Sequence, residues 1–265
     1  SDEESDGTIG TEREVNLALT ATDEDAFVDR LLAGLDAYPR YYAHMGPLNL
    51  AGGVAVDLSP PAEIDPVELA RRIHRGEWVV DLRPRRTFAA AHVAGTVGVE
   101  LADAFSTYLA WLLPWGMPIT LLADEPDHIA EAQRQLVRVG IDRPAGGAAG
   151  GIERWAPDTD RSSYRAITFA ELAAEPELAV LDVRLAGERA DGHVEGSLHL
   201  PLPELLHRVG ELPEAPLAVH CASGYRASIA ASLLDRSGRE VVLVDDTFER
   251  AADSGRTVAT SGDRR

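Results

Sequence analysis

The chain has 265 residues, of which 45% are hydrophobic and 26% charged, a composition typical of folded globular proteins. Its formal net charge of −19 argues against the basic face that nucleic-acid binding requires, and all 25 basic residues are arginine. The longest mostly apolar stretch, residues 108–123, is interrupted by proline and glycine and is too short to cross a membrane. We therefore expect a cytoplasmic protein that contacts neither nucleic acid nor membrane.

The first 54 residues have a pattern of their own. A helix is predicted over residues 23–37, an aromatic patch follows at residues 38–42, and residues 47–53 are interpreted as the exit from this segment. The segment matches neither copy of the repeat that follows it.

The rest of the sequence contains two copies of one pattern. Residues 79–101 align with residues 180–202 without a gap. The matched pairs are Asp81 with Asp182, Arg83 with Arg184, His92 with His193, and Gly95 with Gly196. A repeat of about a hundred residues is too long for a solenoid, so we predict two related domains, at residues 55–157 and 158–265.

Both copies predict the same elements in chain order. The first copy has a helix at 66–75, strands at 78–82 and 119–123, and a helix at 127–139. The second has a helix at 168–175, strands at 179–183 and 217–220, a helix at 226–237, and a last strand at 240–244. Short apolar strands that alternate with helices predict an α/β fold with a parallel sheet flanked by helices in each copy. The glycine-rich residues 146–163 are the predicted joint.

The strongest chemical signal is the segment CASGYR, which links a predicted strand to a predicted helix. It comprises Cys221, Ala222, Ser223, Gly224, Tyr225 and Arg226, and Cys221 is the only cysteine. Ligands of open parallel sheets bind at the carboxyl ends of the strands, and backbone N–H groups beside a helix N-terminus favour an anion there. Both effects favour the thiolate of Cys221. Arg226 is predicted to add charged donors, although a solvated arginine at a helix start is nearly as good an interpretation.

Residues 164–252 resemble a rhodanese, or sulfurtransferase, domain. The matching pieces are Asp182 and Arg184 in LDVR, residues 192–197 in GHVEGS, and the Cys221 loop. The resemblance implies that Cys221 accepts a sulfane sulfur as a persulfide and passes it to a thiol or another acceptor. It also places Asp182 and Arg184 near the site, where structural ion pairing is the preferred interpretation. Of the other residues, Ala222, Ser223, Gly224 and Tyr225 are expected to line the substrate site.

The first copy resembles the same domain but lacks the nucleophile. When Pro118 is aligned with Pro216, Ala123 takes the position of Cys221, and the acidic residues Asp124, Glu125 and Asp127 follow it. Like charges repel an anionic sulfur donor there, so we expect this copy to be inactive and to serve as a scaffold or docking surface.

The N-terminal segment resembles the tail of a metallo-β-lactamase-fold hydrolase of the kind that is fused to rhodanese domains. The matching residues are 7–13, 16–19, 41–42 and 47–49. The resemblance implies that residues 1–54 end a metal-dependent domain, such as a persulfide dioxygenase, that lies upstream. The metal-binding cluster of that family is absent from this sequence, so no cofactor and no metal ligand are predicted for the chain itself.

The sequence thus predicts a rhodanese-type sulfurtransferase that works with small sulfur donors, thiol acceptors and a metallo-β-lactamase-fold domain. A non-catalytic interaction or sulfur-sensing module is the alternative. A phosphatase of the same fold is disfavoured because its cysteine–arginine loop is one residue longer, and arsenate reduction lacks a second cysteine. The small, uncharged Ala222 and Ser223 favour a persulfide over thiosulfate as the donor.

Overall fold

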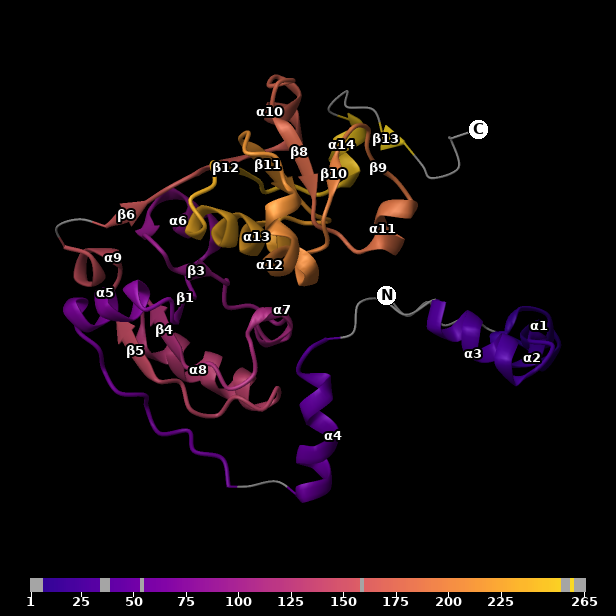
Figure 1. Cartoon of the computed structure of the whole chain (residues 1–265), viewed down its shortest axis with the longest axis horizontal. Helices are drawn as coiled ribbons and strands as arrows, with labels where there is room; N and C mark the ends of the chain where they lie inside the picture. Colours follow the sequence, from indigo (N-terminus) through magenta and orange to yellow (C-terminus); the bar gives the residue numbers. More distant parts are fainter. Residues whose placement is uncertain (1–6, 34–38, 53–54, 158–159, 254–257, 260–265) are drawn as a thin grey trace. The chain divides into compact units, whose positions relative to one another are not determined.

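The computed structural model describes residues 7–33, 39–52, 55–157, 160–253 and 258–259 (Figure 1). Contacts divide the chain into residues 1–38 and residues 39–265. Among the described residues, no helix combines the length and the apolar character needed to span a membrane.

Three short helices lie in the described part of the first unit. They are α1 (Ile9–Val15), α2 (Leu17–Thr20) and α3 (Glu24–Ala33). Thr8 caps α1 by accepting a hydrogen bond from the N–H of Thr11, and Asn16 caps α2 in the same way through Ala18. Helix α3 confirms part of the predicted helix at 23–37, whose last four residues lie outside the described residues.

The first half of the second unit is built on the four-stranded parallel sheet β3-β1-β4-β5. Its strands are β1 (Trp78–Asp81), β3 (Val97–Gly98), β4 (Ile119–Ala123) and β5 (Gly146–Ala149), and β2 (His92–Val93) lies outside the sheet. Its helices are α4 (Tyr42–Ala51), α5 (Pro66–His74), α6 (Arg85–Ala90), α7 (Phe105–Leu112), α8 (Pro126–Val137) and α9 (Ile152–Trp155). Helix α5 begins where Asp65 accepts a hydrogen bond from the N–H of Glu68 and Pro66 takes the first position.

The second half is built on the five-stranded parallel sheet β10-β8-β11-β12-β7. Its strands are β7 (Arg165–Ile167), β8 (Ala179–Asp182), β10 (Leu198–His199), β11 (Leu217–His220) and β12 (Val241–Val244), and β6 (Arg161–Ser162), β9 (His193–Val194) and β13 (Val258–Ala259) lie outside this sheet. Its helices are α10 (Phe169–Ala173), α11 (Ala186–Ala190), α12 (Leu205–Arg208), α13 (Tyr225–Arg236) and α14 (Glu249–Asp253), with 3-10 turns at Leu202–Glu204 and Val209–Glu211. The predicted α/β class, with parallel sheets flanked by helices, is confirmed.

The predicted joint at residues 146–163 is wrong at its start. Residues 146–149 form β5, and a helix, α9, follows it. A Cβ atom on Gly147 would lie 3.1 Å from the Pro61 side chain and 3.3 Å from that of Ile129, so this strand is built from small residues because its neighbours pack closely on it. The glycine content that suggested a linker reflects that close packing.

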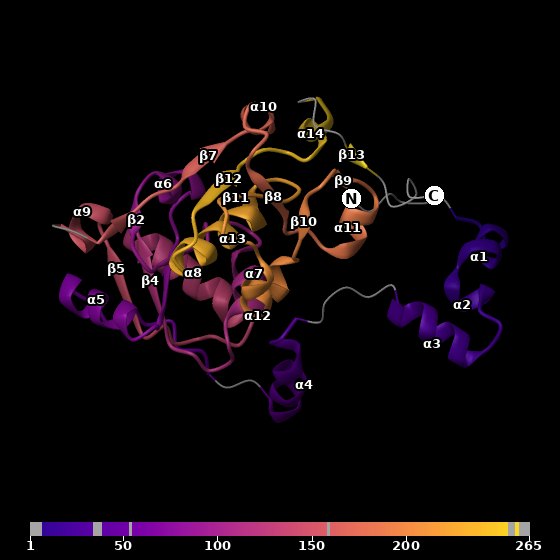
Figure 2. The same cartoon turned by 45° about the horizontal axis from the view of Figure 1, so that its top comes forward.

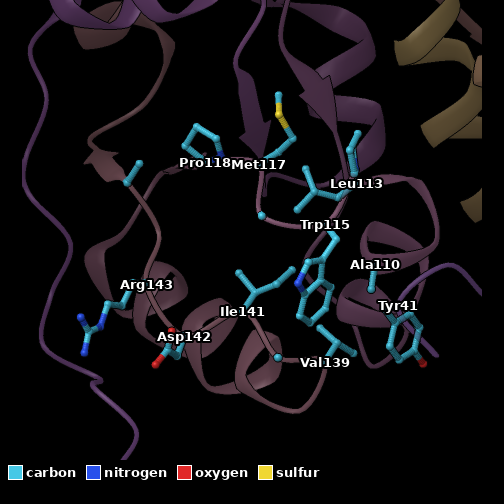
Figure 3. Close-up of a pocket in the computed structure, with 14 residues that line it drawn as sticks. Tyr41, Ala110, Leu113, Trp115, Met117, Pro118, Val139, Ile141, Asp142 and Arg143 are labelled. Carbon is cyan, nitrogen blue, oxygen red and sulfur yellow. The ribbon is translucent and has the colours of Figure 1, made fainter. Parts of the chain in front are cut away.

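The predicted exit at residues 47–53 is also wrong for most of its length. Helix α4 continues to Ala51 and contains Pro47. The helix has tertiary support, because the His44 ring stacks on Trp115 at 4.2 Å and Leu48 lies beside Gly140. A pocket of about 360 Å³ opens beside this contact and is lined by Tyr41, Trp115 and Ile141 among others (Figure 3). Because Pro118, which precedes β4, also lines it, the pocket lies at the opposite end of the first sheet from Ala123.

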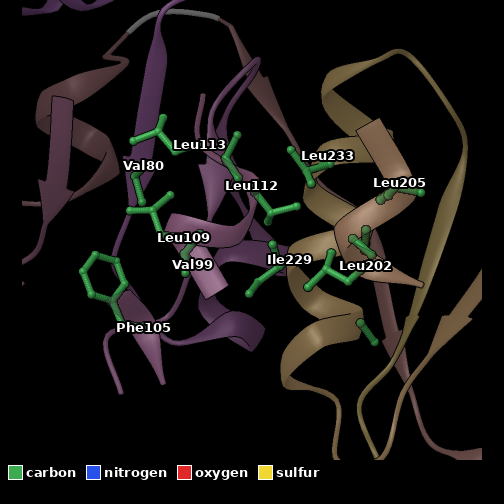
Figure 4. Close-up of a cluster of buried hydrophobic side chains, with 14 of the residues drawn as sticks. Val80, Val99, Phe105, Leu109, Leu112, Leu113, Leu202, Leu205, Ile229 and Leu233 are labelled. Carbon is green, nitrogen blue, oxygen red and sulfur yellow. The ribbon is translucent and has the colours of Figure 1, made fainter. Parts of the chain in front are cut away.

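The two halves share one hydrophobic core. Helix α13 contacts β11 and β12 of its own sheet and β3 of the other, so it lies between the sheets in both views (Figures 1 and 2). Its fully buried Ile229 belongs to the same cluster as Leu109 and Leu112 of α7 (Figure 4). Residues that flank the Cys221 loop are therefore packed against the half without a cysteine.

Polar contacts also join the halves. Strand β6 pairs antiparallel with β2. The His92 ring lies 3.0 Å from the carboxylate of Asp235, near the end of α13, and Ser162 donates a hydrogen bond to the same carboxylate. The first half thus holds the far end of the helix that Cys221 precedes.

Candidate active site

Cys221 directly follows β11 at the carboxyl end of the second sheet. The register pairs His220 with Asp182 of β8, which places Cys221 one residue beyond the paired region. Its side chain is only 1% exposed, so a reagent that reaches the sulfur must present a slender end, such as a terminal sulfur atom.

The backbone around Cys221 offers hydrogen-bond donors. Within the part of the chain that the structure describes, the N–H groups of residues 222–226 have no acceptor. The loop leads directly into the N-terminus of the 12-residue helix α13, which adds partial positive charge. A thiolate or persulfide anion on Cys221 matches this environment.

Gly224 holds the loop in its tight turn. Its φ of 85° lies in the left-handed region that other residues rarely adopt. A Cβ atom there would lie 2.4 Å from Oδ1 of Asp245 and 3.1 Å from the Cα atom of the same residue. Both the backbone conformation and the space therefore require glycine at this position.

Arg226 is paired with Glu188 of α11. The two guanidinium Nη atoms donate hydrogen bonds of 2.5 and 2.6 Å to the two carboxylate oxygens. Burial alone would lower the pKa of Arg226, but the bonds to Glu188 and the nearby charge of Cys221 outweigh burial and raise it. The Arg226 guanidinium, which the sequence analysis expected to bind an anionic ligand, thus already binds a carboxylate. The sequence did not predict Glu188 as its partner.

The first half contributes residues to this site. The Tyr225 hydroxyl donates a 2.6 Å hydrogen bond to the Glu100 carbonyl of the first half, and the Tyr225 ring lies 5.7 Å from that of Tyr108 in α7. Burial raises the pKa of Tyr108, and the charges of Arg226 and Cys221 act on it as well, so its hydroxyl lies within electrostatic range of both. The sequence pattern gave no signal for Tyr108, because in the predicted fold it belongs to the inactive copy.

Comparison with known proteins identifies the second half. A family model described as "Rhodanese-like domain" matches residues 166–253. These residues are a rhodanese-like domain. The predicted resemblance of residues 164–252 to a rhodanese domain is confirmed, and the matched residues include Cys221 and Glu188.

Three similar proteins match different lengths of this chain. The HTH-type transcriptional regulator Rv0324 of Mycobacterium tuberculosis is 34% identical over 97 residues, covering 34% of this chain and 43% of the relative. A metallo-β-lactamase from Staphylococcus aureus is 22% identical with a TM-score of 0.44, covering 55% of this chain and 40% of that one. A thiosulfate sulfurtransferase from Pseudomonas aeruginosa is 20% identical with a TM-score of 0.35, covering 77% and 44%. This chain therefore spans less than half the length of each.

Asp182 and Arg184 lie buried beneath the site of the rhodanese-like domain. Arg184 donates a 2.7 Å hydrogen bond to Asp182 and another of the same length to the Gly192 carbonyl. Asp81 and Arg83 form the same 2.7 Å bond in the first half, which has no cysteine. An ion pair that is present with and without the nucleophile fits a structural role.

His220 is part of the apolar packing behind the loop. Its ring is fully buried, stacks on Phe248 at 5.7 Å and meets Phe169 edge-on at 5.4 Å. Burial lowers its pKa to about 4, against a partial opposing effect of Asp182. The ring is neutral at pH 7 and far too weak a base there to hold a proton from Cys221.

We expect His220 to make the stability of the protein depend on pH. Because its pKa is lower in the folded state than the unfolded value of 6.5, its contribution is complete above pH 6.5 and is lost as the pH falls towards 4. The loss amounts to about 3 kcal/mol, at about 1.4 kcal/mol for each pKa unit. Chemical denaturation of the wild type and of His220→Leu between pH 4 and 7 tests this. A difference in unfolding free energy that does not change with pH would contradict it.

The first half has the same strand register without the reactive residues. Asp81 pairs with Leu122 as Asp182 pairs with His220, so Ala123 takes the position of Cys221. The aligned sequence predicted this substitution. Among the described residues, no group of three or more histidine, cysteine or acidic side chains is arranged to hold a metal ion.

Proposed function

We propose that the rhodanese-like domain is a sulfurtransferase that carries sulfane sulfur as a persulfide on Cys221. The observation that supports this most directly is the position of Cys221 in a loop whose five following N–H groups have no acceptor among the described residues. These donors, with the N-terminus of α13, favour an anionic sulfur at this position.

The transfer step is a thiol–disulfide type of exchange. The Cys221 thiolate attacks the terminal sulfur of a persulfide R–S–S⁻, a new S–S bond forms on Cys221, and R–S⁻ leaves with the electron pair of the broken bond. Delivery is the reverse step with another thiolate, so no oxidant or metal takes part. Arg226 and Tyr225 shape the loop, while Ala222, Ser223 and Gly224 supply its backbone.

In this proposal the first half is a catalytically inactive scaffold, and a metallo-β-lactamase-fold domain is a partner. The scaffold role is supported by the shared core and by the bond from Tyr225 to Glu100. The partner is supported by the sequence resemblance of residues 7–13, 16–19, 41–42 and 47–49, and any metal would belong to it.

The test is the intact mass of the protein after incubation with glutathione persulfide or thiosulfate. We expect a gain of one sulfur atom that a thiol or cyanide removes, and no gain in Cys221→Ser, because this is the only cysteine. Failure of every donor to load a Cys221 that still reacts with an alkylating agent would overturn the proposal.

A sulfur-sensing or interaction module is the second candidate. One similar protein is named a transcriptional regulator, and the site leaves the sulfur of Cys221 almost covered. A domain that loads sulfur but does not turn it over, and that binds a protein partner stably, would favour this candidate.

A further inference from the structure

The Glu188–Arg226 pair is the charged contact beside Cys221. Glu188 is held from two sides, because the Leu185 N–H also donates a 3.1 Å hydrogen bond to it. The Arg226 side chain is 12% exposed and that of Glu188 34%, so the carboxylate is the more accessible member. The group of this pair that solvent reaches more readily is therefore a carboxylate, and the charge of Arg226 is already neutralised by it.

The same chain provides an internal comparison. The buried Asp–Arg pair is present in both halves, as Asp81 with Arg83 and Asp182 with Arg184. In the aligned repeat Thr87 stands opposite Glu188, and the alignment of Ala123 with Cys221 puts His128 opposite Arg226. At these two aligned positions the half with the cysteine has a glutamate and an arginine and the other half has neither, whereas both halves have the Asp–Arg pair.

We propose that Glu188 determines which sulfur donors the domain accepts, by neutralising Arg226 and disfavouring doubly charged donors. The inference rests on the proposed sulfur transfer at Cys221 and adds the substrate class: small persulfides with one negative charge or none at the reacting end. Thiosulfate carries two charges, and the net charge of −19 on the chain adds to its repulsion.

The backbone of the loop carries donors that do not distinguish the two sulfur donors. The N–H groups of residues 222–226 have no acceptor among the described residues, so they are available to a single sulfur anion without any side-chain cation. They fit the persulfide that remains on Cys221 after either donor has reacted. In this proposal the two donors therefore differ in how readily they approach Cys221, because the second negative charge of thiosulfate is repelled by Glu188.

The experiment compares loading of Cys221 by thiosulfate and by glutathione persulfide in the whole chain. In Glu188→Gln, Arg226 keeps its charge without a counter-charge, so we expect the thiosulfate-to-persulfide ratio of kcat/KM to rise about tenfold. Glu188→Asp keeps the charge and should leave the ratio as in the wild type. Glu211→Gln is the matched control, because Glu211 forms a bidentate pair with Arg208 on the surface.

The outcomes separate this inference from the proposed function. A raised ratio in Glu188→Gln alone supports the charge-based selection. An unchanged ratio, or an equal loss of loading by both donors, overturns it and leaves Glu188 as a structural partner of Arg226. No loading of the wild type by any donor overturns the sulfur transfer itself.

Discussion

Gly224→Ala is expected to abolish most of the sulfur loading on Cys221. The new methyl group would collide with Asp245. The backbone φ of 85° at position 224 would also cost about 1–3 kcal/mol for any residue with a side chain. Asp245 is not free to move, because Arg85 of the first half donates a 2.6 Å hydrogen bond to it and Arg86 a 2.5 Å bond. The strain therefore falls on the loop, and we expect loading rates at least tenfold lower, measured by intact mass over time.

Gly238→Ala is the matched control. Gly238 follows the other end of the same helix with a φ of 80°, and a Cβ atom there would meet nothing within 4 Å. It carries the conformational cost without the collision. Equal losses of loading in both variants would show that backbone strain alone is responsible and that Asp245 has no part in holding the loop.

The sequence predicted the elements that follow from local patterns. Strand 119–123 and strand 217–220 match β4 and β11 residue for residue, because apolar runs bounded by polar residues mark buried parallel strands. The loop of Cys221 was found for the same reason, since all its functional atoms lie within six consecutive residues.

Contacts between distant residues were not predictable in this way. Glu188 lies 38 positions before Arg226, and Tyr108 reaches the site from the other half. Strand β5 was missed because its glycines and alanines are selected by close packing on neighbours, a tertiary effect that local propensity reports as a loop. The repeat did contain a usable indication of the site residues. Glu188 and Cys221 both lie at the site, and both differ from the residues at the aligned positions of the first copy, Thr87 and Ala123.

Ile229→Ala is expected to destabilise both halves together. Ile229 is fully buried in the core that α13 shares with α7 and the first sheet (Figure 4). Its truncation removes buried methyl groups and leaves a cavity, at a cost of about 2–5 kcal/mol in unfolding free energy. Such a loss is a large share of the stability of an ordinary domain.

Two probes in this chain report the halves separately. All four tryptophans, Trp78, Trp111, Trp115 and Trp155, lie in the first half, and the only cysteine lies in the second. If the halves unfold as one unit, Ile229→Ala shifts the denaturant midpoint of tryptophan fluorescence and that of Cys221 alkylation by the same amount. A shift confined to Cys221 would show that the halves unfold independently. Coinciding shifts would explain why a chain keeps a half without a nucleophile: the helix that follows the reactive loop needs that half for its own burial.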